Sequence, residues 1–175
     1  MKPSSIALLA SLSTLAGCAP GTSTVEDLAL PAGTYEIYRA DQPAYQKSPS
    51  MELIVSETPL DLSPFSEEAM RYAKVFGDRP PTACVVQRFT DEQYGSTTSL
   101  SFDRPEATSN GWKIRTFETH HFWSWLLLAE RDGRVMGTAE QTGWGGPYTT
   151  AIRGVRVSDP DPQRCVRAGS EIHSE

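Results

Sequence analysis

Three histidines, His120, His121 and His173, are the side chains of this chain best suited to act as a general base or a metal ligand near neutral pH. His120 and His121 are adjacent, and adjacent side chains of a strand point to opposite faces of a sheet, so the two do not converge on one ion. We interpret this pair as partly solvated residues at a strand end. The sequence predicts no metal site and no cofactor, and a hydrolase that uses His120 or His121 is the weakest functional hypothesis.

Other catalytic motifs are missing from the sequence. A nucleophile elbow needs the pattern G-x-S-x-G, which does not occur. The glycine-rich stretch Gly143 to Pro147 lacks the Lys and the Ser or Thr that complete a phosphate-binding loop. The sequence therefore predicts no catalytic residues and favours a protein that is not an enzyme.

The start of the chain combines a basic head containing Lys2 with an apolar run from Ile6 to Ala16 and small residues after it. This is the pattern of a secretory signal peptide. The run is shorter than the ~20 apolar residues that a membrane-spanning helix needs. An ordinary signal peptide cleaved near Ala19 is the alternative, and it would discard Cys18 or leave it as an odd thiol.

Leu15-Ala16-Gly17-Cys18 closes this segment and resembles the lipobox of bacterial lipoproteins. The resemblance implies that residues 1–17 are removed and that Cys18, carrying acyl chains such as palmitate, becomes the first residue of the mature protein. Two or more chains give a firm membrane anchor, whereas one binds reversibly. The residue after the cysteine is Ala19 rather than Asp, which in this family favours the outer membrane, with the domain facing the periplasm.

The remaining two cysteines, Cys84 and Cys165, form an even pair in an exported protein and therefore predict a disulfide. Two buried free thiols are the alternative. In the chain-entropy model a bridge across this span contributes at most about 4 to 5 kcal/mol of stability. It would pin the C-terminal tail to a central strand. A C-x-x-C motif is absent, so redox catalysis has no support.

Residues 18–31 contain proline, glycine and small polar residues without periodicity, and we expect them to form the lipidated cysteine and a flexible tether. Residues 32–175 suit a single globular domain, large enough to bury its own core. The formal net charge is −6, with 22 acidic against 16 basic residues. An acidic domain of this kind is a poor partner for nucleic acid.

One helix is predicted near residues 64–76. Ser63 can cap it and Pro64 can occupy its first position, where the missing N–H costs nothing. Gly77 followed by two prolines ends it. Its apolar face is formed by residues at helical spacing: Phe65, Ala69, Tyr72, Ala73 and Phe76.

The rest of the domain reads as strands, because apolar and polar residues alternate between turn-forming segments. The run 122–129 has helix-forming residues, but Asp132-Gly133 between apolar runs is a hairpin signal, so we predict two strands there. A β-bulge is predicted at Gly154, and the tail from Ser158 onward is predicted to be irregular. The expected strands are residues 34–39, 51–56, 84–89, 99–102, 112–119, 122–129, 135–137 and 149–157.

These elements predict an α+β fold: a mainly antiparallel sheet of about six to eight strands, able to curl toward a barrel, with the helix near residues 64–76 packed on it. No family resemblance extends beyond residue 18.

Aromatic residues are the candidate binding groups. Trp144 and Tyr148 flank the glycine-rich loop and could stack on a sugar or grip a partner; alternatively, the loop is a long hairpin turn whose Trp144 folds over the core. Trp123 and Trp125 are two residues apart and share one face of a strand, where they could line an apolar pocket or form core beneath the helix.

Two functional hypotheses follow. The first is a non-catalytic, membrane-anchored envelope lipoprotein that binds an envelope protein or a cell-wall component, with Trp144 and Tyr148 as contacts. The second is a carrier that encloses a small apolar ligand between strands bearing Trp123 and Trp125.

Overall fold

The computed structural model describes residues 30–41, 49–91, 95–118, 123–131, 134–143 and 145–172. The signal peptide, Cys18 and most of the tether lie outside the described residues. The three histidines and Trp144 also lie outside them.

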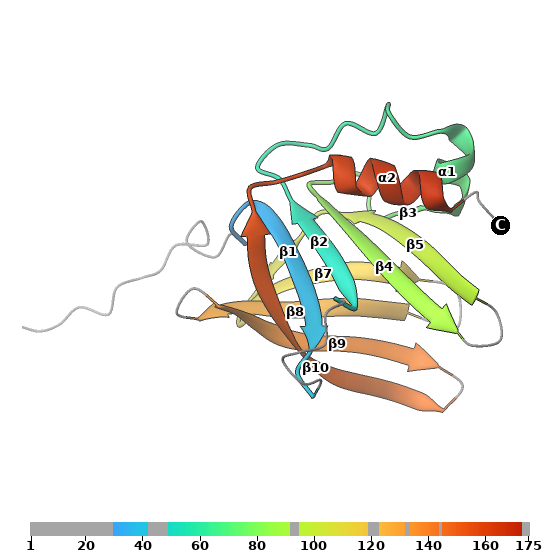
Figure 1. Cartoon of the computed structure of the whole chain (residues 1–175). Coiled ribbons are helices and arrows are strands. Elements are labelled where there is room, and N and C mark those ends of the chain that lie inside the picture. The colour runs from blue at the N-terminus through green and yellow to red at the C-terminus, as the bar shows by residue number, and fades with distance from the viewer. Residues whose placement is uncertain are drawn as a thin grey trace, which may run out of the picture.

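Ten strands form one mixed sheet that curls into a half-barrel (Figure 1). Their order across the sheet is β3-β5-β4-β2-β1-β10-β9-β8-β7-β6, and every neighbouring pair is antiparallel except β3 with β5. The mainly antiparallel sheet is confirmed. The predicted count of six to eight strands is too low, because the short strands β3 and β6 at the two edges of the sheet were not predicted. The strands are β1 (Gly33–Arg39), β2 (Met51–Val55), β3 (Lys74–Val75), β4 (Ala83–Asp91), β5 (Gly95–Asp103), β6 (Glu106–Thr108), β7 (Gly111–Glu118), β8 (Trp123–Arg131), β9 (Arg134–Gly143) and β10 (Gly146–Ser158).

Helix α1 (Glu67–Tyr72) is shorter than the helix predicted for residues 64–76. Its cap is Ser66, whose hydroxyl accepts a hydrogen bond from the N–H of Ala69 at 3.0 Å. Ser63 is not the cap, because the helix begins only at Glu67; the N–H of Ser63 instead donates to the carboxylate of Asp61 in a turn before the helix. After Tyr72 the chain extends to form β3 beside β5, which ends the helix early.

The tail after Ser158 is not irregular, as the sequence suggested, since it contains helix α2 (Gln163–Glu171). At the start of α2 the carboxylate of Asp161 accepts a hydrogen bond of 3.2 Å from the N–H of Gln163, while Pro162 makes no side-chain cap bond. This Asp-Pro start is a helix signal that the sequence-based prediction missed. Cys165, Ala168 and Gly169 are its buried residues. A Cβ atom at Gly169 would come within 3.0 Å of the Phe65 ring, so the absence of a side chain there lets α2 lie close to the segment before α1.

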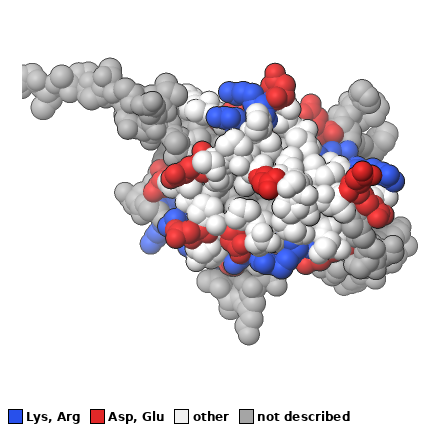
Figure 2. Space-filling model, turned by 90° about the horizontal axis from the view of Figure 1, so that it is seen from above, with Lys and Arg blue, Asp and Glu red and all other residues white. Residues whose placement is uncertain are grey.

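Helix α2 lies on the convex side of the sheet, over β4 and β5, and α1 packs beside it (Figure 1). None of the helices in the described part of the chain is long and apolar enough to span a membrane. Seen from above, this face carries its charged side chains mainly around the edge (Figure 2).

The two faces of the sheet have separate cores, because side chains alternate along each strand. The inner core fills the half-barrel and includes Tyr35, Leu53, Trp112, Ile114 and Leu126. The outer core lies beneath the helices; its members include Ile54, Val86, Leu100, Phe102, Cys165 and Ala168. The half-barrel is therefore packed along its length by side chains.

Residues 123–131 form a strand, as predicted, and pair with β9 in a hairpin whose last register pair is Arg131 with Arg134. The bulge predicted at Gly154 is wrong, because the register of β10 runs unbroken past that residue. The register shift between β1 and β10 lies instead where Thr34 pairs with Ser158 and Tyr35 with Arg156.

The predicted disulfide is confirmed. Cys84 of β4 is bonded to Cys165 of α2, with their Cα atoms 6.6 Å apart. The preceding residue of the helix, Arg164, donates a hydrogen bond of 2.9 Å to the carboxylate of Glu52 in β2, which also pairs with Arg88 of β4. A covalent bond and an ion-pair cluster thus both hold α2 on the sheet.

Candidate functional site

The described surface has an aromatic depression on the outer side of β7 and β8, which we call the outer aromatic groove. Its volume is about 260 Å³. Trp123 and Trp125 form its aromatic part. The remaining lining residues come from β6 and β7: Glu106, Lys113, Arg115, Phe117 and Glu118.

Strand register explains how the groove is assembled. Trp125 is opposite Arg115, and Trp123 is opposite Glu118, in the β7–β8 pairing. A register shift in β7 between Arg115 and Phe117 places one extra residue on that strand. The ring of Phe117 is 38% exposed and lines the groove with both tryptophans.

The two tryptophans are stacked on each other. Their ring centroids are 3.6 Å apart and the ring planes differ by 8°. Trp125 is further fixed by a 2.8 Å hydrogen bond from its Nε1 to the carboxylate of Glu140 in β9, and the ammonium of Lys113 lies 3.7 Å from its ring centroid. These contacts hold a half-buried aromatic platform in one orientation.

Charged side chains of both signs surround this platform, with acidic ones in excess. Glu106, Glu118 and Glu140 are acidic, whereas of the two basic residues that line the groove Arg115 is already paired with the buried Asp103. Such a groove offers an aromatic ring face for stacking together with hydrogen-bond donors and acceptors at its rim, and its excess of negative charge disfavours an anion. A neutral polar molecule with flat or ring-shaped apolar faces suits it.

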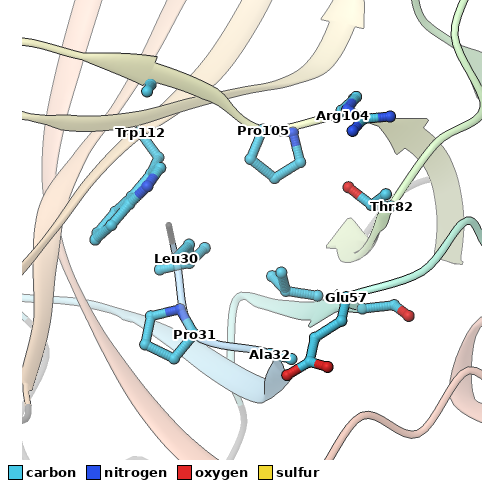
Figure 3. Close-up of a pocket in the computed structure, with 11 residues that line it drawn as sticks. Leu30, Pro31, Ala32, Glu57, Thr82, Arg104, Pro105 and Trp112 are labelled. Atoms are coloured by element: carbon cyan, nitrogen blue, oxygen red, sulfur yellow. The ribbon is translucent and has the colours of Figure 1, made fainter. Parts of the chain in front are cut away.

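A second depression, which we call the mouth pocket, lies at the end of the half-barrel where β1, β4 and β7 begin and β2 and β5 end (Figure 3). Its volume is about 400 Å³. Its apolar walls include Leu30, Pro31, Val55, Pro105 and Trp112, and its polar residues are Ser56, Glu57, Thr82 and Arg104.

The chain before β1 is fixed beside this pocket by Tyr35. The phenol of Tyr35 donates a hydrogen bond of 2.7 Å to the carbonyl oxygen of Pro31. Burial raises the pKa of Tyr35 above its ordinary value, so the phenol stays protonated and remains a donor.

A third depression, of about 220 Å³, lies between α2 and the segment before α1. Phe65 and Phe102 form part of its wall and pack edge to face, with ring centroids 5.0 Å apart. It lies directly over Cys165 and belongs to the packing of the helices on the sheet.

The structure brings together some of the candidate residues found in the sequence. Trp123 and Trp125 share a face, as predicted, but they face away from the inner core and do not lie beneath the helices. Tyr148 is 48% exposed on β10. Trp144, His120 and His121 lie outside the described residues, so the predictions made for them stay predictions.

Sequence reasoning missed Lys113 and Glu140, which fix the Trp125 ring. Their positions opposite or beside β8 follow from strand register, and no local motif marks them. Among the described residues, no group of three His, Cys, Asp or Glu side chains could hold a metal ion.

Comparisons with known proteins give no relative for this chain: no family model matches it, and no curated protein or solved structure is found similar. The outer aromatic groove and the mouth pocket are therefore interpreted from their own chemistry.

Proposed function

We propose that this chain is a non-catalytic bacterial envelope lipoprotein that binds a neutral cell-wall saccharide through the outer aromatic groove. The stacked pair Trp123 and Trp125 is the observation that carries the proposal. Tryptophan ring faces bind the apolar faces of sugar rings, and the charged side chains at the rim can bond their hydroxyl groups.

Preorganisation supports this role. The hydrogen bond to Glu140 fixes the ring of Trp125, and Lys113 and Trp123 cover the two faces of that ring. Trp125 therefore serves as the support, and the ligand stacks on the other face of Trp123. A ring that is already held in place costs little entropy to order, so binding is correspondingly stronger. An exposed hydrophobic side chain without such support would be an ordinary surface feature.

The resemblance of Leu15-Ala16-Gly17-Cys18 to a lipobox supplies the location. Acylation of Cys18 would attach the chain to the outer membrane with the domain on the periplasmic side. A tether of residues 19–31 spans at most about 45 Å when fully extended. The domain would therefore work within reach of the membrane and of the cell wall beneath it.

A protein partner is the competing interpretation. A stable protein interface buries roughly 1,200 to 2,000 Å² and has an apolar centre with few charges. The outer aromatic groove is small and has four charged side chains around its aromatic rings. This composition suits a saccharide better than a large protein surface.

The carrier hypothesis based on Trp123 and Trp125 is not favoured, since neither ring belongs to the inner core. The hypothesis that Trp144 and Tyr148 contact a partner stays a prediction and is tested in the same assay. The hydrolase hypothesis, which depends on His120 or His121, also stays a prediction.

The decisive experiment is co-sedimentation of the mature domain with purified, protein-free cell-wall sacculi. We expect Trp123→Ala, which removes the stacking face, and Trp125→Ala, which removes its support, to weaken binding about tenfold each, from the loss of about 1.4 kcal/mol of stacking. Tyr72→Ala removes an exposed aromatic ring on α1, outside the groove, and is the matched control. Trp144→Ala and Tyr148→Ala test the loop. Sacculi bound equally well by wild type and both groove variants would refute the saccharide proposal.

Cross-linking in cells separates the competing partner. If a protein is captured by wild type and lost with Trp125→Ala, while sacculi are not bound, the groove binds a protein instead. Cys18→Ala tests the anchor independently, because it should abolish metabolic labelling with a fatty acid. Acyl label that persists on this variant would remove the lipobox interpretation.

A further inference from the structure

Trp112 has a buried hydrogen-bond donor without a partner. The residue is 6% exposed, and its indole Nε1 is the one buried side-chain nitrogen or oxygen of the described residues that makes no hydrogen bond. The indole N–H can only donate. Leaving such a group unpaired costs about 1 to 3 kcal/mol, so its presence in a folded domain calls for a reason.

The indole ring forms one wall of the mouth pocket. In Figure 3 its nitrogen-bearing edge faces the pocket, with Leu30 and Pro31 on the same side and Thr82 across from it. A volume of about 400 Å³ falls within the roughly 300 to 1,000 Å³ of small-molecule sites. The unpaired donor and the cavity therefore occur at the same place.

We propose that the mouth pocket binds a small, mainly apolar molecule carrying a carbonyl or carboxylate oxygen, which accepts the hydrogen bond of Trp112 Nε1. The apolar body of the molecule lies against Pro31, Val55 and Pro105. The pocket contains one acidic and one basic side chain, Glu57 and Arg104, whose charges offset each other. The ligand's acceptor oxygen can therefore belong to a neutral carbonyl or to a carboxylate.

Leu30 acts as a plug in this site. The indole nitrogen is out of contact with solvent, so an acceptor oxygen reaches it only by taking the place of a side chain beside the ring. Leu30 lies next to Trp112 and precedes the first strand. Its side chain can therefore turn aside while the backbone stays attached through the hydrogen bond from Tyr35 to Pro31. The site closes over its donor when empty and opens as a ligand enters.

This site is independent of the outer aromatic groove. Trp112 points into the half-barrel, whereas Trp125 points outward from the neighbouring strand. A ligand in the mouth pocket therefore contacts neither of the stacked tryptophans, and the saccharide proposal can fail without affecting this one.

The test uses the mature domain labelled with ¹⁵N, in which each tryptophan gives one indole N–H resonance. The probes are 2-acetylnaphthalene, 2-naphthoate and 2-ethylnaphthalene, which share a ring system and differ in the acceptor. We expect a probe with an oxygen to move the Trp112 resonance downfield and to bind about tenfold more tightly than 2-ethylnaphthalene, as expected for one hydrogen bond. Comparison of the ketone with the carboxylate shows which acceptor is preferred.

Three variants complete the test. Trp112→Phe removes the donor and should abolish the preference for probes with an oxygen. Leu30→Ala removes the plug and should tighten binding of the preferred probe. Ala107→Phe fills the pocket from an exposed position of β6 and should abolish binding while leaving the other three indole resonances in place. Equal binding of all three probes, or binding that survives Ala107→Phe, would overturn the proposal.

Discussion

Arg115 of β7 forms an ion pair with the buried carboxylate of Asp103 at the end of β5. The backbone N–H of Arg115 donates to Asp103 at 2.7 Å, and its guanidinium donates through Nη2 at 2.9 Å and through Nε at 3.3 Å. β5 and β7 lie near opposite edges of the sheet and are not hydrogen-bonded to each other as strands. The Asp103–Arg115 ion pair therefore links the two sides of the half-barrel. The Asp103 side chain is 1% exposed, which makes Arg115 its required counter-charge.

Replacing Arg115 with Met should destabilise the domain by about 3 kcal/mol, because it leaves the buried carboxylate of Asp103 without a counter-charge and with only the backbone N–H as a donor. The free energy of unfolding in urea, followed by tryptophan fluorescence, measures the change. Methionine retains the apolar stem, so the loss reports the missing guanidinium more than lost packing.

Arg39→Met is the matched control for this prediction. Arg39 pairs with Asp41 on the surface, where the two side chains are 51% and 63% exposed. A surface pair of this kind contributes at most about 1 kcal/mol. If Arg115→Met costs no more than Arg39→Met, the proposed role of the Asp103–Arg115 pair is wrong.

Glu52 should make the stability of the domain depend on acid pH. Burial acts to raise the pKa of Glu52, but hydrogen bonds and charge from Arg164 and Arg88 outweigh it, and the pKa lies below its ordinary value. A lowered pKa stabilises the fold above the unfolded pKa of about 4.3, and this contribution is lost as the pH falls further.

The measurement is urea unfolding of wild type and Glu52→Gln at several pH values between about 6 and 2. The stability difference between the two proteins should be largest near neutral pH and should shrink as the pH falls below about 4.3. Glu67→Gln, at an exposed position of α1, is the control. A difference between wild type and Glu52→Gln that stays constant over this range would contradict the prediction.

The disulfide should stabilise the domain chiefly by holding α2. Converting both Cys84 and Cys165 to Ala is expected to lower the free energy of unfolding by about 2 to 4 kcal/mol. Because α2 is attached through Cys165 and Arg164, its amides should be the ones whose hydrogen exchange accelerates most. Equal urea midpoints for the oxidised and the reduced wild type would show that the bridge adds no stability.

The sequence was sufficient for features that depend on local pattern. The disulfide followed from the number of cysteines, and the β8–β9 hairpin followed from Asp132-Gly133 between apolar runs. Helix α2 was harder to predict, because its one local signal is the Asp161-Pro162 start and its place depends on tertiary contacts. These contacts are made by Cys165, Ala168 and an ion pair from Arg164 to the sheet. Such tertiary contacts override weak local preference.

The candidate sites were predictable only in part, for a related reason. Trp123 and Trp125 had to share a face, but both faces of β8 are apolar, with Leu126 and Leu128 on the other side, so the sequence did not reveal which face is inward. The unpaired nitrogen of Trp112 and the pairing of β7 with β8 depend on register and packing across the half-barrel. No spacing along the chain reveals them.

The stacked tryptophans should give a spectroscopic signal that checks the groove without a ligand. Indole rings 3.6 Å apart and nearly parallel couple electronically, which predicts an exciton signal in the far-ultraviolet circular dichroism spectrum. Trp123→Phe and Trp125→Phe should each remove this signal. Trp112→Phe should retain it, since Trp112 lies on the opposite face of the sheet. A spectrum of Trp125→Phe that keeps the full signal would mean that the pair is not stacked in solution, and the basis for a preorganised saccharide site would be lost.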